Sequence, residues 1–163
     1  MTTEFEYSPR EGRATDGAIG GKWVPVSGPF SLGVEALALM PVNRSHQGAG
    51  IEAQLLGTVR EQSYRIHVNA GGFHDPRGGP AETGWRASAL GEIVKTNYRL
   101  GLELFAKDSN IRRTDMRAGL GFIYSFAGFD VRPGVHVGLT PGAPDISASL
   151  WIATKFSLLG DAS

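Results

Sequence analysis

The residues with the clearest chemical potential in this sequence lie between Tyr64 and Ala70, in the stretch YRIHVNA. Arg65, His67 and Asn69 occupy every second position, with apolar residues between them. This period of two is typical of a β-strand with one polar and one apolar face. A guanidinium, an imidazole and an amide on one face can form ion pairs and hydrogen bonds, and the imidazole can titrate near neutral pH.

Similar polar residues recur on one face of other alternating stretches and predict a polar interior that carries both signs of charge. This set is Glu35, Glu52, Arg65, His67, Asn69, Arg86, Glu92, Arg99, Glu103, Arg117, Arg132 and His136. If the strands close into a barrel, its arginines and glutamates can form a charged ladder along the interior that selects which molecules pass. They can equally form a plug that holds a narrow barrel shut. His67 and His136 fit either a pH-sensitive constriction or hydrogen-bonded filling of the lumen.

The sequence offers little for catalysis. The predicted loops contain His74 and Asp75, with Asp108, Asp115 and Asp145. These residue types fit an Asp/His hydrolase site at the rim of a barrel, but polar loops also carry them by default. The sequence contains no Gly-x-Ser-x-Gly motif, phosphate-binding glycine loop or metal-ligand cluster. We therefore expect no enzyme activity, no catalytic residues, no cofactor and no metal.

Composition limits the class of protein. A chain of 163 residues with 41% hydrophobic content predicts one domain spanning 1–163, with 157–163 as a tail. The formal net charge of zero argues against a nucleic-acid partner. Cysteine is absent, no apolar run is long enough for a transmembrane helix, and the N-terminus shows no signal peptide. The 23 glycines suit a curved, turn-rich sheet.

Alternation of polar and apolar residues predicts ten strands and no helix. The predicted strands are 3–8, 18–26, 30–42, 51–60, 64–70, 85–94, 98–106, 116–126, 129–139 and 146–156. The connections between them alternate between long and short along the chain, as in bacterial outer-membrane barrels. Most strands are also of the length that a tilted strand needs to cross a bilayer. The predicted fold is an all-β, antiparallel, up-and-down transmembrane β-barrel of about ten strands.

The two faces of these strands are assigned by the solvent that each would meet. The apolar face is predicted to contact lipid, with aromatic residues near the strand ends at the membrane interfaces. These aromatic residues are Tyr64, Phe73, Trp85, Tyr98, Phe126, Phe129 and Phe156. Pro133 falls inside a predicted strand, where it indicates a bulge or a local gap in pairing.

The order of four motifs resembles that of the outer-membrane proteins called the transporter-like, or meta-pathway of phenol degradation, family. The motifs are YRIHVNAGG, GEIVKTNYRLGLELFAKD, RAGLGFIYSF and FDVRPGVHVGLTPGAPDISASLWIATKF. Asn69 and Gly71 match a family strand ending Asn-x-Gly, Glu103 an inward glutamate, 143–145 an Ala-Pro-Asp turn, and Phe156 the closing aromatic. The similarity covers about residues 30 to 156. It implies that N-terminal strands and a signal peptide precede this chain in the family.

The resemblance implies passage of small, aromatic or hydrophobic molecules across the outer membrane of a Gram-negative bacterium. The implied partners are outer-membrane lipid, lipopolysaccharide and the barrel-assembly machinery. Two alternatives remain open from the residues themselves. One is a closed structural or loop-displaying barrel without conductance, and the other is a soluble, lipocalin-like ligand-binding barrel with its faces reversed.

Overall fold

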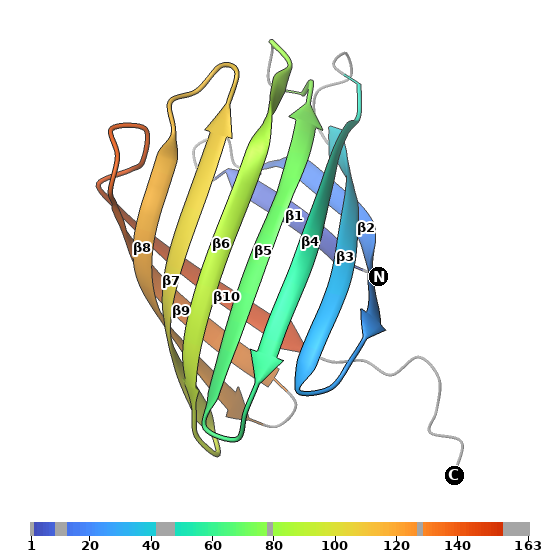
Figure 1. Cartoon of the computed structure of the whole chain (residues 1–163). Helices are drawn as coiled ribbons and strands as arrows, with labels where there is room; N and C mark the ends of the chain where they lie inside the picture. Colours follow the sequence, from blue (N-terminus) through green and yellow to red (C-terminus); the bar gives the residue numbers. More distant parts are fainter. Residues whose placement is uncertain (1, 9–12, 42–47, 78–79, 127–128, 155–163) are drawn as a thin grey trace.

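A computed structural model of the chain describes residues 2–8, 13–41, 48–77, 80–126 and 129–154 (Figure 1). These residues form ten strands, joined by turns and loops. No helix in these ranges is long and apolar enough to cross a membrane. The strands are β1 (Thr2–Ser8), β2 (Arg13–Val26), β3 (Phe30–Pro41), β4 (Gly50–Arg60), β5 (Tyr64–Asp75), β6 (Glu82–Val94), β7 (Tyr98–Ser109), β8 (Asp115–Phe126), β9 (Phe129–Gly138) and β10 (Ile146–Thr154).

Each strand pairs antiparallel with the next one along the chain. The sheet order is therefore the sequence order, β1 to β10, which confirms the predicted all-β, up-and-down arrangement. Among the described residues the ladder ends at β1 on one side and at β10 on the other. Figure 1 shows the sheet curled, so that β1, β2, β9 and β10 lie behind the central strands.

The connections are sorted by length between the two ends of the sheet. The described turns 27–29, 61–63 and 95–97 lie at one end, and the described connections 110–114 and 139–145, which are longer, lie at the other. The first of the short turns contains Gly28, whose φ of 142° is a conformation that favours glycine. The predicted sorting of long and short connections is therefore present.

Several predicted loops are shorter in the structure than the sequence suggested. The segment 74–84 was expected to be a loop, but His74 pairs with Thr83 and Asp75 with Glu82, so β5 and β6 extend into it. β2 likewise begins at Arg13 rather than at residue 18, and β7 continues to Ser109. Polar residues end the apolar pattern, but they do not end backbone pairing, because strand hydrogen bonds are made by the main chain.

The two faces of the sheet differ in chemistry as the alternation predicts. One face, called the outer face here, carries aliphatic side chains that remain exposed, such as Leu102 at 58%, Leu120 at 63% and Leu150 at 66%. The opposite face, called the inner face, carries most of the polar residues, with Glu52 and Glu92 buried at 3% and 4% exposure. Leu37 and Leu39 share the inner face on β3 and are also buried.

Aromatic side chains gather on the outer face near the short turns. Tyr98 stacks on Phe122 with ring centroids 5.8 Å apart, and Phe126 contacts both Tyr124 and Phe129. Tyr64 and Trp85 are exposed on the same face. These positions confirm the predicted outward orientation of the strand-end aromatics apart from Phe73, whereas Phe156 lies outside the described residues.

Candidate functional site: the inner face of the sheet

The structure places the polar residues predicted to line a lumen on the inner face. They come from seven strands, β3 to β9, and alternate there with the outward aliphatic residues. The predicted set on this face is Glu35, Glu52, Arg65, His67, Asn69, Arg86, Glu92, Arg99, Glu103, Arg117, Arg132 and His136. Their shared orientation follows from strand alternation and from the unbroken antiparallel order of the sheet.

The part of the inner face near the short turns carries a chain of charged contacts, called here the ion-pair belt. His67 Nε2 lies 3.3 Å from Glu92 Oε2, and Arg99 Nη1 lies 3.2 Å from the same oxygen. Arg99 Nη2 continues to Asp130 Oδ2 at 3.4 Å, and that oxygen also contacts Arg132 at 3.0 Å. The belt therefore crosses from β5 to β9. It compensates Glu92, whose side chain is only 2% exposed, with a permanent cation.

A second cluster lies nearer the long connections and centres on Phe73, which the sequence interpretation had assigned to the lipid-facing aromatics. That assignment is wrong, because Phe73 is buried at 5% exposure on the inner face. The Arg86 guanidinium lies 5.4 Å from its ring centroid and the Lys107 ammonium 4.5 Å. Arg86 also contacts Glu52 at 2.9 Å. The ring thus serves as an apolar, electron-rich surface between two cations.

His136 reaches Glu103 across an intervening strand. Glu103 on β7, Gly119 on β8 and His136 on β9 lie in one cross-strand row, and His136 Nε2 is 3.2 Å from Glu103 Oε2. A Cβ at Gly119 would lie 2.1 Å from the imidazole, so only glycine allows this contact. The absence of a side chain in the middle position therefore lets the two outer positions pair.

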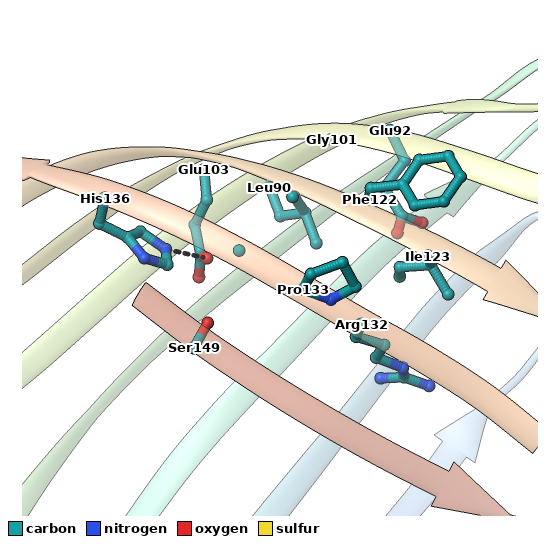
Figure 2. A pocket seen from close by; sticks show the side chains of 12 residues that line it. Leu90, Glu92, Gly101, Glu103, Phe122, Ile123, Arg132, Pro133, His136 and Ser149 are labelled. Carbon is teal, nitrogen blue, oxygen red and sulfur yellow. Dashed lines mark hydrogen bonds and ion pairs between the residues drawn. The ribbon is translucent and has the colours of Figure 1, made fainter. Parts of the chain in front are cut away.

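The next row toward the short turns contains almost no side chains. Gly101, Gly121 and Gly134 are cross-strand neighbours on β7, β8 and β9, and Ser149 follows on β10. Above this row the inner face is hollowed by a cavity of about 210 Å³. Figure 2 shows Glu103 and His136 at one side of this cavity and Ile123 and Arg132 toward the other. The glycine row therefore creates space that side chains would otherwise fill.

This cavity continues toward the long connections. A second hollow of about 280 Å³ shares Glu103, His136 and Ser149 with the first. A third, of about 540 Å³, shares Phe105 and Arg117 with the second and extends to residues of the 110–114 and 139–145 connections. These three contiguous hollows are called the inner groove. It runs along β7 to β10, with Glu92 and Arg132 of the ion-pair belt in its lining, whereas the Phe73 cluster occupies the wall from β4 to β7.

His74 and Asp75, the adjacent pair among the loop residues named above for a hydrolase site, lie at the long-connection end of the sheet. His74 Nδ1 contacts Thr83 Oγ1 at 2.7 Å, whereas Asp75 binds the guanidinium of Arg77 at 2.8 Å. Arg77 also donates to the carbonyl oxygens of Gly17 and Met40, on β2 and β3. His74 and Asp75 thus have separate partners. The ion pair between Asp75 and Arg77 connects the β5–β6 connection to β2 and β3.

The inner groove depends on residues that the sequence interpretation did not single out. The glycines of the row lie far apart in the sequence, and their alignment requires the exact strand register. Phe73 could have been placed correctly, because it is an odd number of residues from Tyr64, Ile66 and Val68. Its parity was a better guide than its hydrophobicity.

Fold and inner face together define an antiparallel up-and-down sheet of porin-like architecture. The chain resembles the solved structure of a porin refined at 1.8 Å resolution, with a TM-score of 0.57 and 12% sequence identity. The match covers 89% of this chain and 53% of the porin, so the chain spans about half the porin's length. No family model matches the sequence, and neither does a curated protein. Membership of the transporter-like family therefore stays a prediction.

Proposed function

We propose that the chain is part or all of an outer-membrane β-barrel that lets small solutes cross along the inner groove. The observation that carries this proposal is the outer face, where large apolar side chains are exposed on every strand from β2 to β10. Soluble monomers rarely expose contiguous apolar surface of this extent. A lipid environment would remove that cost, and the aromatic residues near the short turns suit a membrane interface.

A membrane location sets a requirement for the sheet edges. In hydrocarbon every backbone donor and acceptor needs a partner, so the edges of β1 and β10 must be paired. With an even number of strands, β1 and β10 run antiparallel and can close on each other; further strands of a longer protein can serve equally well. The porin-like fold supports this arrangement.

The inner groove supports passage rather than a fully plugged interior. It holds space along the β7–β10 wall, and its lining combines charged side chains with glycine and apolar residues. The resemblance to the transporter-like family adds small hydrophobic or aromatic molecules as the expected permeants. The alternative, a closed structural barrel, is favoured by the ion-pair belt, which crosses the inner face from β5 to β9 and contributes Glu92 and Arg132 to the lining of the groove.

Filling the groove at Gly121 tests the proposed path. A Cβ at Gly121 would have its nearest neighbour at 4.0 Å, so a larger side chain can enter the groove without a backbone clash. We expect Gly121→Leu to reduce single-channel conductance and solute uptake into vesicles several-fold, while folding is retained. Conductance in planar bilayers and uptake by reconstituted vesicles are the measurements.

Gly91→Leu is the matched control, because Gly91 is exposed on the outer face of β6 and has no atom within 4 Å of a built Cβ. It adds the same side chain to the lipid side and is expected to leave conductance unchanged. A native chain without conductance, but with detergent-dependent folding and a heat-sensitive gel shift, would support the closed barrel. A stable monomer without detergent would reject a membrane location altogether.

A further inference from the structure

Glu103 differs from the other inner-face carboxylates of β6 to β9 in the kind of partner that it has. Each of the others pairs with an arginine or a lysine; they are Glu82, Glu92, Asp115 and Asp130. Glu103 pairs with His136, and an imidazole is a cation only when it is protonated. Within the described ranges of the chain, the Glu103 carboxylate therefore has no permanent cation as its ion-pair partner.

The immediate neighbours of Glu103 on the inner face are uncharged. Across the strand seams it lies between Leu90 of β6 and Gly119 of β8. Along β7 the adjacent inner-face residues are Gly101 and Phe105, because alternate residues of a strand share a face. The Glu103 side chain is 36% exposed. A negative charge that a solute can reach thus lies on an otherwise uncharged stretch of the wall.

The arginines that line the same hollows have carboxylate partners of their own. Arg117, which lines the second hollow with Glu103, donates two hydrogen bonds to Asp115. Arg132, in the lining of the first hollow, pairs with Asp130. Neither guanidinium is an ion-pair partner of Glu103, so the groove retains an acceptor for a cationic solute.

The first hollow extends from Glu103 over the glycine row. Its lining there combines the apolar side chains of Leu90 and Ile123 with the backbone of the glycines. Figure 2 shows Glu103 at the cavity with Leu90 beside it and the Ser149 hydroxyl directed toward the same space. A molecule in this hollow therefore meets a carboxylate at one end, and beyond it apolar side chains and a floor without side chains.

We propose that Glu103 and the first hollow form a binding site for small organic cations, namely primary ammonium compounds that carry a compact apolar group. The ammonium group donates to the Glu103 carboxylate, and the Ser149 hydroxyl offers a second acceptor. The apolar group lies over the glycine row against Leu90 and Ile123. An inorganic cation would use the carboxylate but leave this apolar lining unoccupied. The inference rests on the proposed function and deepens it, because it assigns a class of substrate to the inner groove.

Calorimetric titration of the folded protein in detergent micelles tests the site without requiring passage of the solute. We expect benzylammonium to bind saturably at neutral pH. Methylammonium, which lacks the ring, and benzoate, which lacks the positive charge, should bind several-fold more weakly. Glu103→Gln preserves the size of the side chain but removes its charge, and it is expected to weaken benzylammonium binding about tenfold. Gly121→Leu, which fills the hollow, should weaken it several-fold.

Glu61→Gln is the matched control, because Glu61 is exposed in the 61–63 turn and its substitution changes the net charge by the same amount. It is expected to leave benzylammonium binding unchanged. Equal weakening by Glu61→Gln and Glu103→Gln would reduce the effect to net charge and reject the site. Unchanged binding in Glu103→Gln, or methylammonium binding as tight as that of benzylammonium, would also reject it. The heat-sensitive gel shift shows that each variant is folded.

Failure of the site and failure of the proposed function give different results. Binding of benzylammonium that is sensitive to Glu103→Gln, but without conductance or uptake, supports the site and rejects passage. Conductance and uptake without benzylammonium binding reject the site and leave the proposed path along the groove in place.

Discussion

Replacing Val68 with lysine is expected to prevent the chain from inserting stably into lipid vesicles. Val68 lies in the middle of β5 on the outer face, where its side chain is 51% exposed. A lysine on the lipid face near the bilayer midplane costs about 2–4 kcal/mol. The cost arises because the ammonium group must leave water without gaining a partner. Insertion is measured by the heat-sensitive gel shift and by flotation of the protein with vesicles.

The adjacent substitution, His67→Ala, provides the control for this prediction. His67 points to the inner face, where it contacts Thr58 and Glu92. Its loss removes these contacts, but Glu92 retains Arg99, so the expected destabilisation is only about 1 kcal/mol and insertion should persist. The opposite result, insertion of Val68→Lys and failure of His67→Ala, would mean that the faces are reversed, as in a soluble ligand-binding barrel.

The second large effect is expected at Arg99. Arg99→Met removes the guanidinium that contacts the Glu92 carboxylate, whose side chain is 2% exposed, and leaves Arg65, the cross-strand neighbour, as the remaining nearby permanent cation. Breaking one partner of a buried ion pair typically costs about 3–5 kcal/mol. Asp130 is affected less, because it retains Arg132 and also accepts a hydrogen bond from Ser125. Urea unfolding of the vesicle-bound protein, followed by tryptophan fluorescence, measures the change in free energy of unfolding.

Two further variants isolate the cause of this loss. Adding Glu92→Leu to Arg99→Met removes the uncompensated charge and should recover most of the stability. Arg112→Met removes an arginine that is 73% exposed and whose partner Glu82 retains Lys107, so it should cost at most about 1 kcal/mol. If Arg99→Met and Arg112→Met lower the free energy of unfolding by the same small amount, the charges of the ion-pair belt are as accessible to water as those of surface residues.

Sequence periodicity was sufficient to predict the order and pairing of most strands. A strand exposes alternate residues to opposite faces, so the pattern around His67 and Val68 assigned both faces of β5 without tertiary information. Short turns between successive alternating stretches likewise indicated antiparallel neighbours, because a connection of two or three residues can only join strands side by side. The β8–β9 ladder lacks the two positions between the Gly121–Gly134 and Tyr124–Val131 pairs, next to Pro133. This gap was also predictable, since proline cannot donate to the ladder.

Errors occurred where the sequence was interpreted by chemical type rather than by position. Phe73 was grouped with interfacial aromatics although its parity placed it on the inner face. The ends of β5, β6 and β7 were placed too early or too late, because polar side chains were taken to end the strands. Main-chain pairing continues past these residues, into positions where both faces of the hairpin can be hydrated.

The sequence by itself thus determined the strands, their order and the chemistry of each face, because these depend on local alternation and on short connections. Only the tertiary structure decided which inner residues meet. Glu92 and Arg99 pair across one seam, and Glu103 reaches His136 over Gly119. The same register aligns Gly101, Gly121 and Gly134 into the floor of the groove. A shift of one residue in any strand would turn these side chains to the other face, and local sequence does not encode that register.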